Sequence, residues 1–452
     1  MNPFRLLEQL YADPVSRGIW SADATVSAWL RVEGELARAQ AGVGLITMAD
    51  AEAIAAACAP GGIRHDSLWK AARNVGYPIL GLVQEIAHQL PPGPGGRVHY
   101  GATTQDIMDT ALSLQLVESC DHLDALVVAV GDALAEKVTA HVDTVLAART
   151  HGQQAVPTTF GAKMAVYLSQ FADCLDRLRA SRSQVAMVSL FGAGGTNAAM
   201  APYGTEVRHA LAAELGLGGS DIPWHVARHR VVDFALTCGI LAAVCVRFAR
   251  EVVDLSRNEI AELLEQPGHL KGASSTMPQK MNPIRAESIV GFGIAAQSES
   301  AGLMRTIEAG HERSAGEWQA EWILLPQVVE HTASAVTLLH EMVSTLVVDA
   351  ESMQQNLGVD GGLLMSEAMM MSLAPVLGRE QAHSLVYEAA HSSRRAGRPF
   401  TETVASLLAD RGLGTTGEQP LSPEEYLGEA RGICKASHDR WSAVVAERAE
   451  HP

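Results

Sequence analysis

The chain has 452 residues, of which 47% are hydrophobic and 19% are charged, and its formal net charge is −17. This composition is ordinary for a soluble globular protein and excludes a nucleic-acid-binding protein, because no Lys/Arg cluster is longer than a pair. Only 5% of the residues are aromatic, and the abundance of Ala, Leu and Val favours helix over sheet.

Short helices joined by loops are expected over the first hundred residues. Ser21 or Asp23 can cap a helix whose apolar residues recur at helical spacing through Ala39. The Pro-Pro-Gly-Pro-Gly-Gly stretch at 91–96 is predicted to be irregular and to end this region.

Long helices are predicted next, because apolar residues recur at i, i+3, i+4 and i+7 with little interruption. They cover about residues 106–149, 160–190, 228–265, 282–308 and 327–357. Helices that are hydrophobic around most of their circumference need partners on several sides. The sequence therefore predicts a bundle that continues across subunit boundaries.

The helices shorten again after about residue 348. Residues 412–417 are predicted to form a loop, and Ser422-Pro423-Glu424-Glu425 a capping box. We therefore expect three domains: an N-terminal α domain at 1–105, a central helical bundle at 106–347 and a C-terminal α domain at 348–452.

The cysteines and the hydropathy pattern point to a cytoplasmic protein without a membrane partner. No signal peptide opens the chain, and the longest apolar run, 234–246, is too short to span a bilayer. The cysteines lack metal-ligand spacing and are predicted to be buried free thiols in a reducing compartment. They are Cys58, Cys120, Cys174, Cys238, Cys245 and Cys434.

Three polar motifs interrupt the helices. They are His-Tyr-Gly-Ala-Thr-Thr-Gln-Asp at 99–106, Arg-Thr-His-Gly-Gln-Gln-Ala-Val-Pro-Thr-Thr at 149–159, and Gly-Ala-Ser-Ser-Thr-Met-Pro-Gln-Lys-Met-Asn-Pro at 272–283. All three lie where predicted helices begin or end, and the free N–H groups of helix N-termini suit carboxylates. The sequence therefore predicts a site for a small di- or tricarboxylate.

The third motif has the groups needed to remove a proton from carbon. Such a proton, next to a carboxylate, is very weakly acidic, and its removal leaves a dianionic aci-carboxylate. Lys280 and Asn282 can stabilise that charge where it develops. The Ser274 hydroxyl can act as base if nearby positive charge and N–H groups lower its pKa. His151, paired with Glu287, can move a second proton.

The third motif also resembles the G-S-S-x-M-P-x-K-x-N signature of the fumarase/aspartase superfamily, with Ala273 in place of a glycine. The resemblance covers essentially the whole chain. It implies an all-α, three-domain fold whose central long-helix bundle forms a twenty-helix core in a homotetramer. It also implies that the three motifs converge from three different subunits onto one active site.

The resemblance implies roles for individual residues. Ser274 is the catalytic base of a mobile loop, Lys280 polarises a carboxylate, and His151 pairs with Glu287 on the other side of the substrate. Independently of the resemblance, the sequence around Arg228 and Arg230 allows them either to bind a second carboxylate or to form a solvated helix start. Substrate-binding positions are Thr103, Thr104, Gln105, Thr150, Gln153, Ser275, Met277 and Asn282. No metal or cofactor is implied.

Four stretches, at 101–110, 223–225, 311–322 and 426–431, look most like bacterial 3-carboxy-cis,cis-muconate cycloisomerases. Those enzymes carry a tryptophan in the place of His151 and lack the acid at Glu287. The His–Glu pair is that of the eliminating lyases. We therefore expect a lyase that cleaves a C–N or C–O bond of a substituted succinate by anti β-elimination and releases fumarate.

Three alternatives remain open. A lactonising cycloisomerase comes first. An adenylosuccinate lyase is next, although residues 10–13 read Leu-Tyr-Ala-Asp and lack the Arg-Tyr pattern of its nucleotide site. The third is a structural, crystallin-like relative, which the presence of Ser274, Lys280 and His151 argues against.

Overall fold

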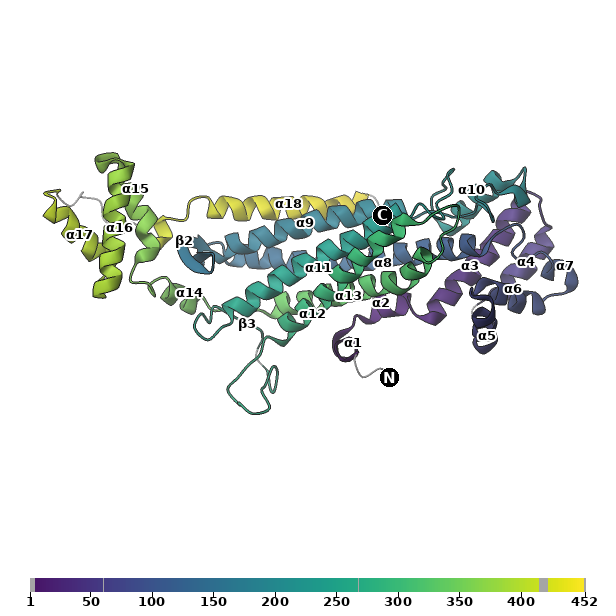
Figure 1. The fold of residues 1–452 in the computed structure, drawn as a ribbon, viewed down its shortest axis with the longest axis horizontal. Helices are drawn as coiled ribbons and strands as arrows, with labels where there is room; N and C mark the ends of the chain where they lie inside the picture. Colours follow the sequence, from purple (N-terminus) through teal and green to yellow (C-terminus); the bar gives the residue numbers. More distant parts are fainter. Residues whose placement is uncertain (1–4, 60, 267, 414–421, 451–452) are drawn as a thin grey trace. The chain divides into compact units, whose positions relative to one another are not determined.

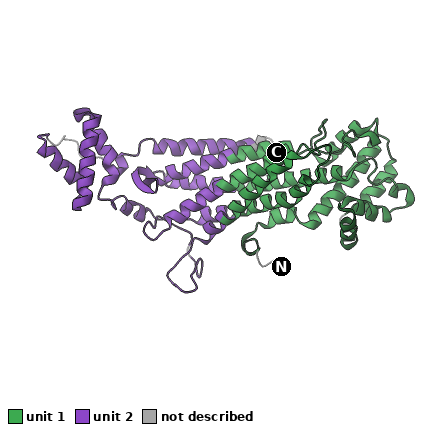
Figure 2. Ribbon diagram, in the orientation of Figure 1, with its two compact units in different colours: residues 1–127, 174–243, 291–337 green, residues 128–173, 244–290, 338–452 purple. Residues whose placement is uncertain are grey.

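The computed structural model describes residues 5–59, 61–266, 268–413 and 422–450. The described chain is predominantly helical, with helices α1–α18 and two small two-stranded sheets (Figure 1). The predicted all-α fold is confirmed. Two compact units are built from alternating segments, unit 1 from 1–127, 174–243 and 291–337, and unit 2 from 128–173, 244–290 and 338–452 (Figure 2). The three-domain boundaries stay a prediction.

Unit 1 begins with short helices packed around an aliphatic core. Ser21 caps α3, where its hydroxyl accepts a hydrogen bond from the Ala24 N–H at 3.1 Å, as predicted. The helices are α1 (Leu6–Tyr11), α2 (Pro14–Ile19), α3 (Ala22–Gly42), α4 (Met48–Ala57), α5 (His65–Val75), α6 (Ile79–His88), α7 (Pro92–Gly95) and α10 (Gly204–Leu215), with a 3₁₀ turn at Ala198–Met200. The prediction that 91–96 is irregular was wrong at α7. Prolines are tolerated there because the first turn of a helix needs no N–H donors.

The predicted long helices are present, and the boundary between the units falls within each of them. They are α8 (Thr104–Ala140), α9 (Phe160–Val185), α11 (His229–Leu255), α12 (Ile284–Leu303) and α13 (Glu317–Thr345), with a 3₁₀ turn at Met304–Glu308 after α12. Four predicted ends were wrong. The helix predicted at 106–149 stops at Ala140, because residues 145–150 form a strand, and the one predicted at 228–265 stops at Leu255. The helix predicted at 327–357 begins at Glu317, passes through Pro326 and ends at Thr345, and the separate helix α14 follows it.

Helix α11 is long and apolar enough to cross a membrane by length and composition alone. However, 72% of its most apolar window is buried inside the protein. The core helix of a soluble protein has this pattern, so the burial favours a core helix.

Unit 2 contains a β-hairpin and a group of shorter helices. Its elements are β1 (Val145–Thr150), β2 (Gln153–Thr159), β3 (Leu263–Leu264), β4 (Val347–Val348), α14 (Ala350–Asn356), α15 (Ser366–Leu377), α16 (Arg379–Ala396), α17 (Phe400–Asp410) and α18 (Ala430–Glu450), with 3₁₀ turns at Leu363–Met365 and Pro423–Glu425. Strand β1 pairs antiparallel with β2, and β3 with β4. Leu373, Leu385 and Phe400 belong to the core of α15–α17.

Two C-terminal predictions can be compared with unit 2. The capping box at Ser422 is present, and the Ser422 N–H donates to Glu425 Oε2 at 2.8 Å. It begins a 3₁₀ turn. Most of the predicted loop at 412–417 lies outside the described residues, which do not include 414–421.

Asp13 ties three helices of unit 1 together. Its carboxylate caps α2 by accepting from the Ser16 N–H at 2.7 Å, and it also contacts His122 of α8 at 2.8 Å and Thr337 of α13 at 3.0 Å. Burial by itself raises the pKa of Asp13, but the hydrogen bonds from His122, Ser16 and Thr337 outweigh it and lower the pKa to about 2. The ionised carboxylate therefore stabilises the folded state.

We predict that Asp13→Asn destabilises the protein by about 2 kcal/mol at neutral pH, because it removes charge-assisted hydrogen bonds. A lowered folded-state pKa contributes stability above 3.8, the ordinary value, and loses it as the pH falls toward about 2. Denaturant unfolding of both proteins over a pH series measures the difference. A difference that stays constant down to the lowest pH would contradict the account.

Candidate functional site

The Ser274 loop lies between β3 and α12 in unit 2. The Ser274 hydroxyl oxygen accepts hydrogen bonds from the N–H groups of Thr276 at 3.3 Å and Met277 at 3.1 Å. These two donors hold the oxygen in one place and would stabilise negative charge on it. The side chain of Ser274 is half-buried, while those of Ser275, Met277 and Lys280 are exposed. The loop thus presents its polar groups outward.

The base of this loop is closed by Asn282 and Gly272. The backbone N–H and the side-chain amide of Asn282 both donate to the Gly272 carbonyl oxygen, each at 2.9 Å. Gly272 has φ +62°, and a Cβ there would come within 2.3 Å of the Asn282 carbonyl oxygen, so only glycine fits. The amide that was predicted to bind a carboxylate is therefore engaged within the loop.

Glu265 organises the start of α12, a role that the sequence did not reveal. Its carboxylate accepts from the N–H groups of Arg285 at 3.2 Å and Ala286 at 2.8 Å and so satisfies free donors of the first turn. Glu287, in the same turn, is exposed. Within the described residues, the Glu287 side chain forms no hydrogen bond or ion pair, although its backbone N–H donates to the Pro283 carbonyl at 3.0 Å.

His151 stands at the tip of the β1–β2 hairpin. Thr150 pairs with Gln153, and the two residues between them, His151 and Gly152, have φ of 52° and 75°. Two consecutive positive φ values in a two-residue hairpin loop define a type I′ turn. Thr150, His151 and Gln153 are all exposed. The predicted pair with Glu287 is not formed within one described chain, and the pairing stays a prediction.

Arg149 and Glu262 anchor the hairpin beneath His151. The Arg149 guanidinium donates to both Glu262 oxygens, at 2.8 and 2.6 Å, and the Asn356 amide donates to one of them at 2.8 Å. Glu262 is completely buried. The second strand is tied to the same group, because the Gln154 amide donates to the Asn356 carbonyl at 2.8 Å. The tip is thus presented on a rigid support.

The first motif is organised in unit 1 by Asp106. Its buried carboxylate accepts from the N–H groups of Thr103 at 3.0 Å and of Phe191 and Gly192 at 2.9 Å each, and it contacts His225 Nε2 at 2.8 Å. Thr103 and Thr104 are half-buried at the start of α8. This carboxylate fixes the backbone that carries both threonines.

The side chains of Gln105 and His99 both make contacts within unit 1. The Gln105 side chain is buried, and its amide donates to the His225 carbonyl at 2.8 Å. His99 Nδ1 lies 2.7 Å from Glu33 Oε1. Burial lowers the pKa of His99, but the Glu33 carboxylate has the larger combined effect and raises it. The sequence left the role of His99 open, and nothing local identified Glu33 as its partner.

Arg228 is buried in a charged cluster of unit 1. Its guanidinium donates to both Glu321 oxygens, at 2.9 and 2.5 Å, and to Asp109 Oδ2 at 2.9 Å, and it lies over the Trp224 ring. These contacts occupy the guanidinium and favour a structural role over either sequence-based interpretation. Arg230 is half-buried and contacts the Met187 sulfur.

The structure groups the predicted site residues into separate sets. Unit 2 carries the Ser274 loop, Glu287 and the His151 hairpin, and no hydrogen bond or ion pair among the described residues joins the loop to the hairpin. Unit 1 carries Thr103, Thr104, Gln105, Arg228 and Arg230.

We predict that Arg228→Met costs about 3–5 kcal/mol of stability, because it leaves two carboxylates buried without their partner. Arg230→Met serves as the matched control and is expected to change stability by less than about 1 kcal/mol. Thermal and denaturant unfolding measure both effects. An Arg228 variant of normal stability with a raised KM would instead assign this residue to the substrate.

The chain matches two family models. The model described as "Lyase" covers residues 10–297, and the model described as "Adenylosuccinate lyase C-terminus" covers residues 362–436. Together they account for all three motifs and for much of the C-terminal region.

Curated relatives and a solved structure match along nearly the whole chain. A 3-carboxy-cis,cis-muconate cycloisomerase from Pseudomonas aeruginosa is 35% identical and covers 94% of both chains. An N-acetyl-S-(2-succino)cysteine lyase from Enterococcus italicus is 32% identical over 94% of this chain and 93% of its own. The crystal structure of the 3-carboxy-cis,cis-muconate lactonizing enzyme from Pseudomonas putida, 31% identical, superposes with a TM-score of 0.90 over 98% of this chain and 100% of that one. The chain therefore belongs to the fumarase/aspartase superfamily, as a lyase or a cycloisomerase.

Proposed function

We propose that this protein is a lyase that removes a substituent from a substituted succinate by anti β-elimination and releases fumarate. The observation that carries the proposal is His151 at the tip of an anchored hairpin, with its imidazole exposed and free of protein partners in the described chain. A side chain held in this way can act on a substrate rather than on the fold. The acid at Glu287 and the oriented Ser274 hydroxyl support the same chemistry.

The proposed reaction begins at Ser274 in its oxyanion form. The oxyanion takes a proton from the carbon next to a carboxylate and becomes the neutral hydroxyl, and the electron pair of the C–H bond moves onto that carboxylate to give an aci-carboxylate dianion. Lys280 and Asn282 stabilise the new charge. The Asn282 side-chain amide has two N–H donors, and the Gly272 carbonyl uses one of them, so the second can donate to the substrate carboxylate.

The second half of the proposed reaction uses His151. The electron pair returns to form the carbon–carbon double bond while the bond to the substituent breaks. His151, oriented by Glu287, gives a proton to the departing atom. The products are fumarate and the protonated leaving group.

The leaving group is proposed to be joined through nitrogen or oxygen. The similarity to an N-acetyl-S-(2-succino)cysteine lyase adds a thioether as a third candidate. The second candidate function is the lactonising cycloisomerase, favoured by the whole-length similarity to such enzymes. Parallel incubation with aspartate, nitrosuccinate, a 2-succinocysteine, adenylosuccinate and 3-carboxymuconate distinguishes them. Fumarate supports elimination, and a lactone supports cycloisomerisation.

We further propose that the protein is a cytoplasmic homotetramer in which three subunits complete each site. Apolar side chains are exposed on the long helices, where Val166 of α9, Ile240 of α11 and Ile294 of α12 are each more than 40% accessible, and such residues suit a helix–helix interface. The free, buried cysteines fit a reducing compartment. Analytical ultracentrifugation tests the assembly, and a stable monomer at working concentration would overturn it.

We predict that Ser274→Ala lowers kcat by about 10²–10⁴-fold on the active substrate, because it removes the base. Folding and assembly are expected to be unchanged, since the loop closes through Asn282 and Gly272. Ser406→Ala, at an exposed position of α17, is the matched control and should keep full activity. A Ser274 variant with near-wild-type kcat would show that another group is the base.

We predict that His151→Asn lowers kcat by a similar factor, about 10²–10⁴-fold, without changing stability. Asparagine is a favourable residue at positive φ, so the type I′ turn is kept while the imidazole is lost. Steady-state kinetics and thermal unfolding give the two readouts. Retained fumarate production by this variant would remove His151 from the mechanism.

A further inference from the structure

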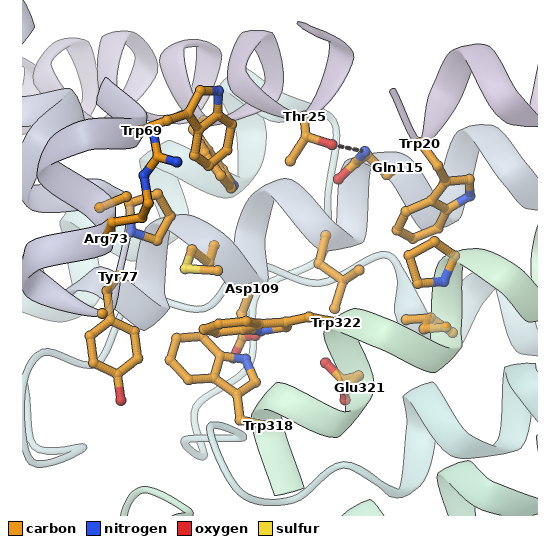
Figure 3. Close-up of a pocket in the computed structure, with 18 of the residues that line it drawn as sticks. Trp20, Thr25, Trp69, Arg73, Tyr77, Asp109, Gln115, Trp318, Glu321 and Trp322 are labelled. Carbon is orange, nitrogen blue, oxygen red and sulfur yellow. Dashed lines mark hydrogen bonds between the residues drawn. The ribbon is translucent and has the colours of Figure 1, made fainter. Parts of the chain in front are cut away.

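Unit 1 contains a cavity of about 900 Å³ between α3, α5, α8 and α13 (Figure 3). None of the residues proposed for elimination lines it. Tryptophans dominate its walls, since five of the seven in the chain are there, although aromatic residues make up only 5% of the sequence. They are Trp20, Trp29, Trp69, Trp318 and Trp322, joined by Tyr77.

The aromatic rings form contiguous walls. Trp318 and Trp322 meet edge to face with centroids 4.8 Å apart, and Tyr77 stacks on Trp318 at 5.9 Å. Trp29 and Trp69 meet edge to face at 6.3 Å. Indole faces attract apolar groups and cations. The Trp322 indole N–H is buried and has no hydrogen-bond partner in the described part of the chain.

The cavity also contains an incompletely satisfied carboxylate. Asp109 and Glu321 both line it, and each is only 1% exposed. Arg228 occupies both oxygens of Glu321 but only Oδ2 of Asp109. Within residues 5–59, 61–266, 268–413 and 422–450, no hydrogen bond reaches Asp109 Oδ1. Figure 3 shows Asp109 between Trp69 and Arg73 on one side and Trp20 on the other.

The charges around the cavity leave a negative excess. The lining includes one further acid, Asp66, and one base, Arg73. Together with Arg228 behind the wall, three carboxylates face two guanidiniums. Burial and the neighbouring Glu321 raise the pKa of Asp109 to about 6, against the opposing effect of Arg228, because the buried carboxylate is poorly solvated.

We propose that this cavity binds a small organic cation, a protonated amine joined to an aromatic body. The ammonium group donates to Asp109 Oδ1 and neutralises the excess charge, while the body packs against the indole rings. An anion would meet the uncompensated carboxylate. A neutral ligand of the same shape would lack the charge-assisted hydrogen bond. The site is independent of the proposed elimination, because it uses none of its residues.

Three probes that share one ring test the proposal: benzylamine, benzyl alcohol and benzoate. Tryptophan fluorescence titration of the full-length protein reports directly on the cavity, and calorimetry confirms the affinities. We expect benzylamine to bind at least about tenfold more tightly than benzyl alcohol, the factor that one charge-assisted hydrogen bond supplies, and benzoate to bind most weakly. Equal affinities, tightest binding of benzoate or no saturable binding would overturn the proposal.

Two variants locate the binding. Asp109→Asn keeps the shape of the side chain and leaves Arg228 paired with Glu321, so the preference for the amine over the alcohol should disappear. Trp69→Leu keeps the charged cluster and should weaken both ligands. Trp441→Phe is the matched control, because Trp441 packs against Gly131 in unit 2 and its loss should change neither affinity.

Circular dichroism establishes that each variant is folded before binding is compared. If Asp109→Asn does not fold, the Trp69→Leu titration still decides the location. An amine preference that survives Asp109→Asn, or an affinity unchanged by Trp69→Leu, would place the ligand elsewhere and overturn the proposal.

Discussion

The buried carboxylate of Asp106 is the constraint on which the start of α8 depends. It gathers three backbone N–H groups and one imidazole from three separate segments of unit 1. A buried carboxylate is costly unless hydrogen-bond donors replace the water that it has lost. Because the donors are backbone groups, the carboxylate fixes the course of the chain around Thr103 rather than the position of one side chain.

The same solution recurs in unit 2 with different residues. Glu262 holds the hairpin through Arg149 and Asn356, and Glu265 holds the first turn of α12 through two N–H groups. The chain has 51 acidic residues and 34 basic ones. Several of the acids, such as Asp13, Asp106 and Glu262, are buried and stabilise the fold through hydrogen bonds. Of the proposed catalytic groups, His151, Lys280 and Glu287 are exposed and Ser274 is half-buried. The buried acids therefore stabilise the fold, while different side chains, held in place by them, are free to contact a substrate.

The sequence predicted those features whose cause is local. Apolar periodicity predicted the long helices, and the side chains of Ser21 and Ser422 predicted two helix starts. The β1–β2 hairpin was missed, because strand pairing is a contact between segments and the apolar residues before Arg149 also suit a helix. Glu262, Glu265 and Glu33 were missed for a related reason. Each anchors a residue distant in the chain or a backbone N–H, and no spacing rule connects such partners.

The turn at His151 has a consequence for how this scaffold changes over time. Both residues of the loop have left-handed backbones, and the side chain at the apex contributes nothing to the described core. Under the proposed mechanism, an exchange at that single site alters the reaction while the remaining architecture is preserved. Only residues that tolerate such a backbone, or whose benefit exceeds a cost of about 1 kcal/mol, are accessible there. Few residue types fit the hairpin apex, but an exchange among them costs little stability.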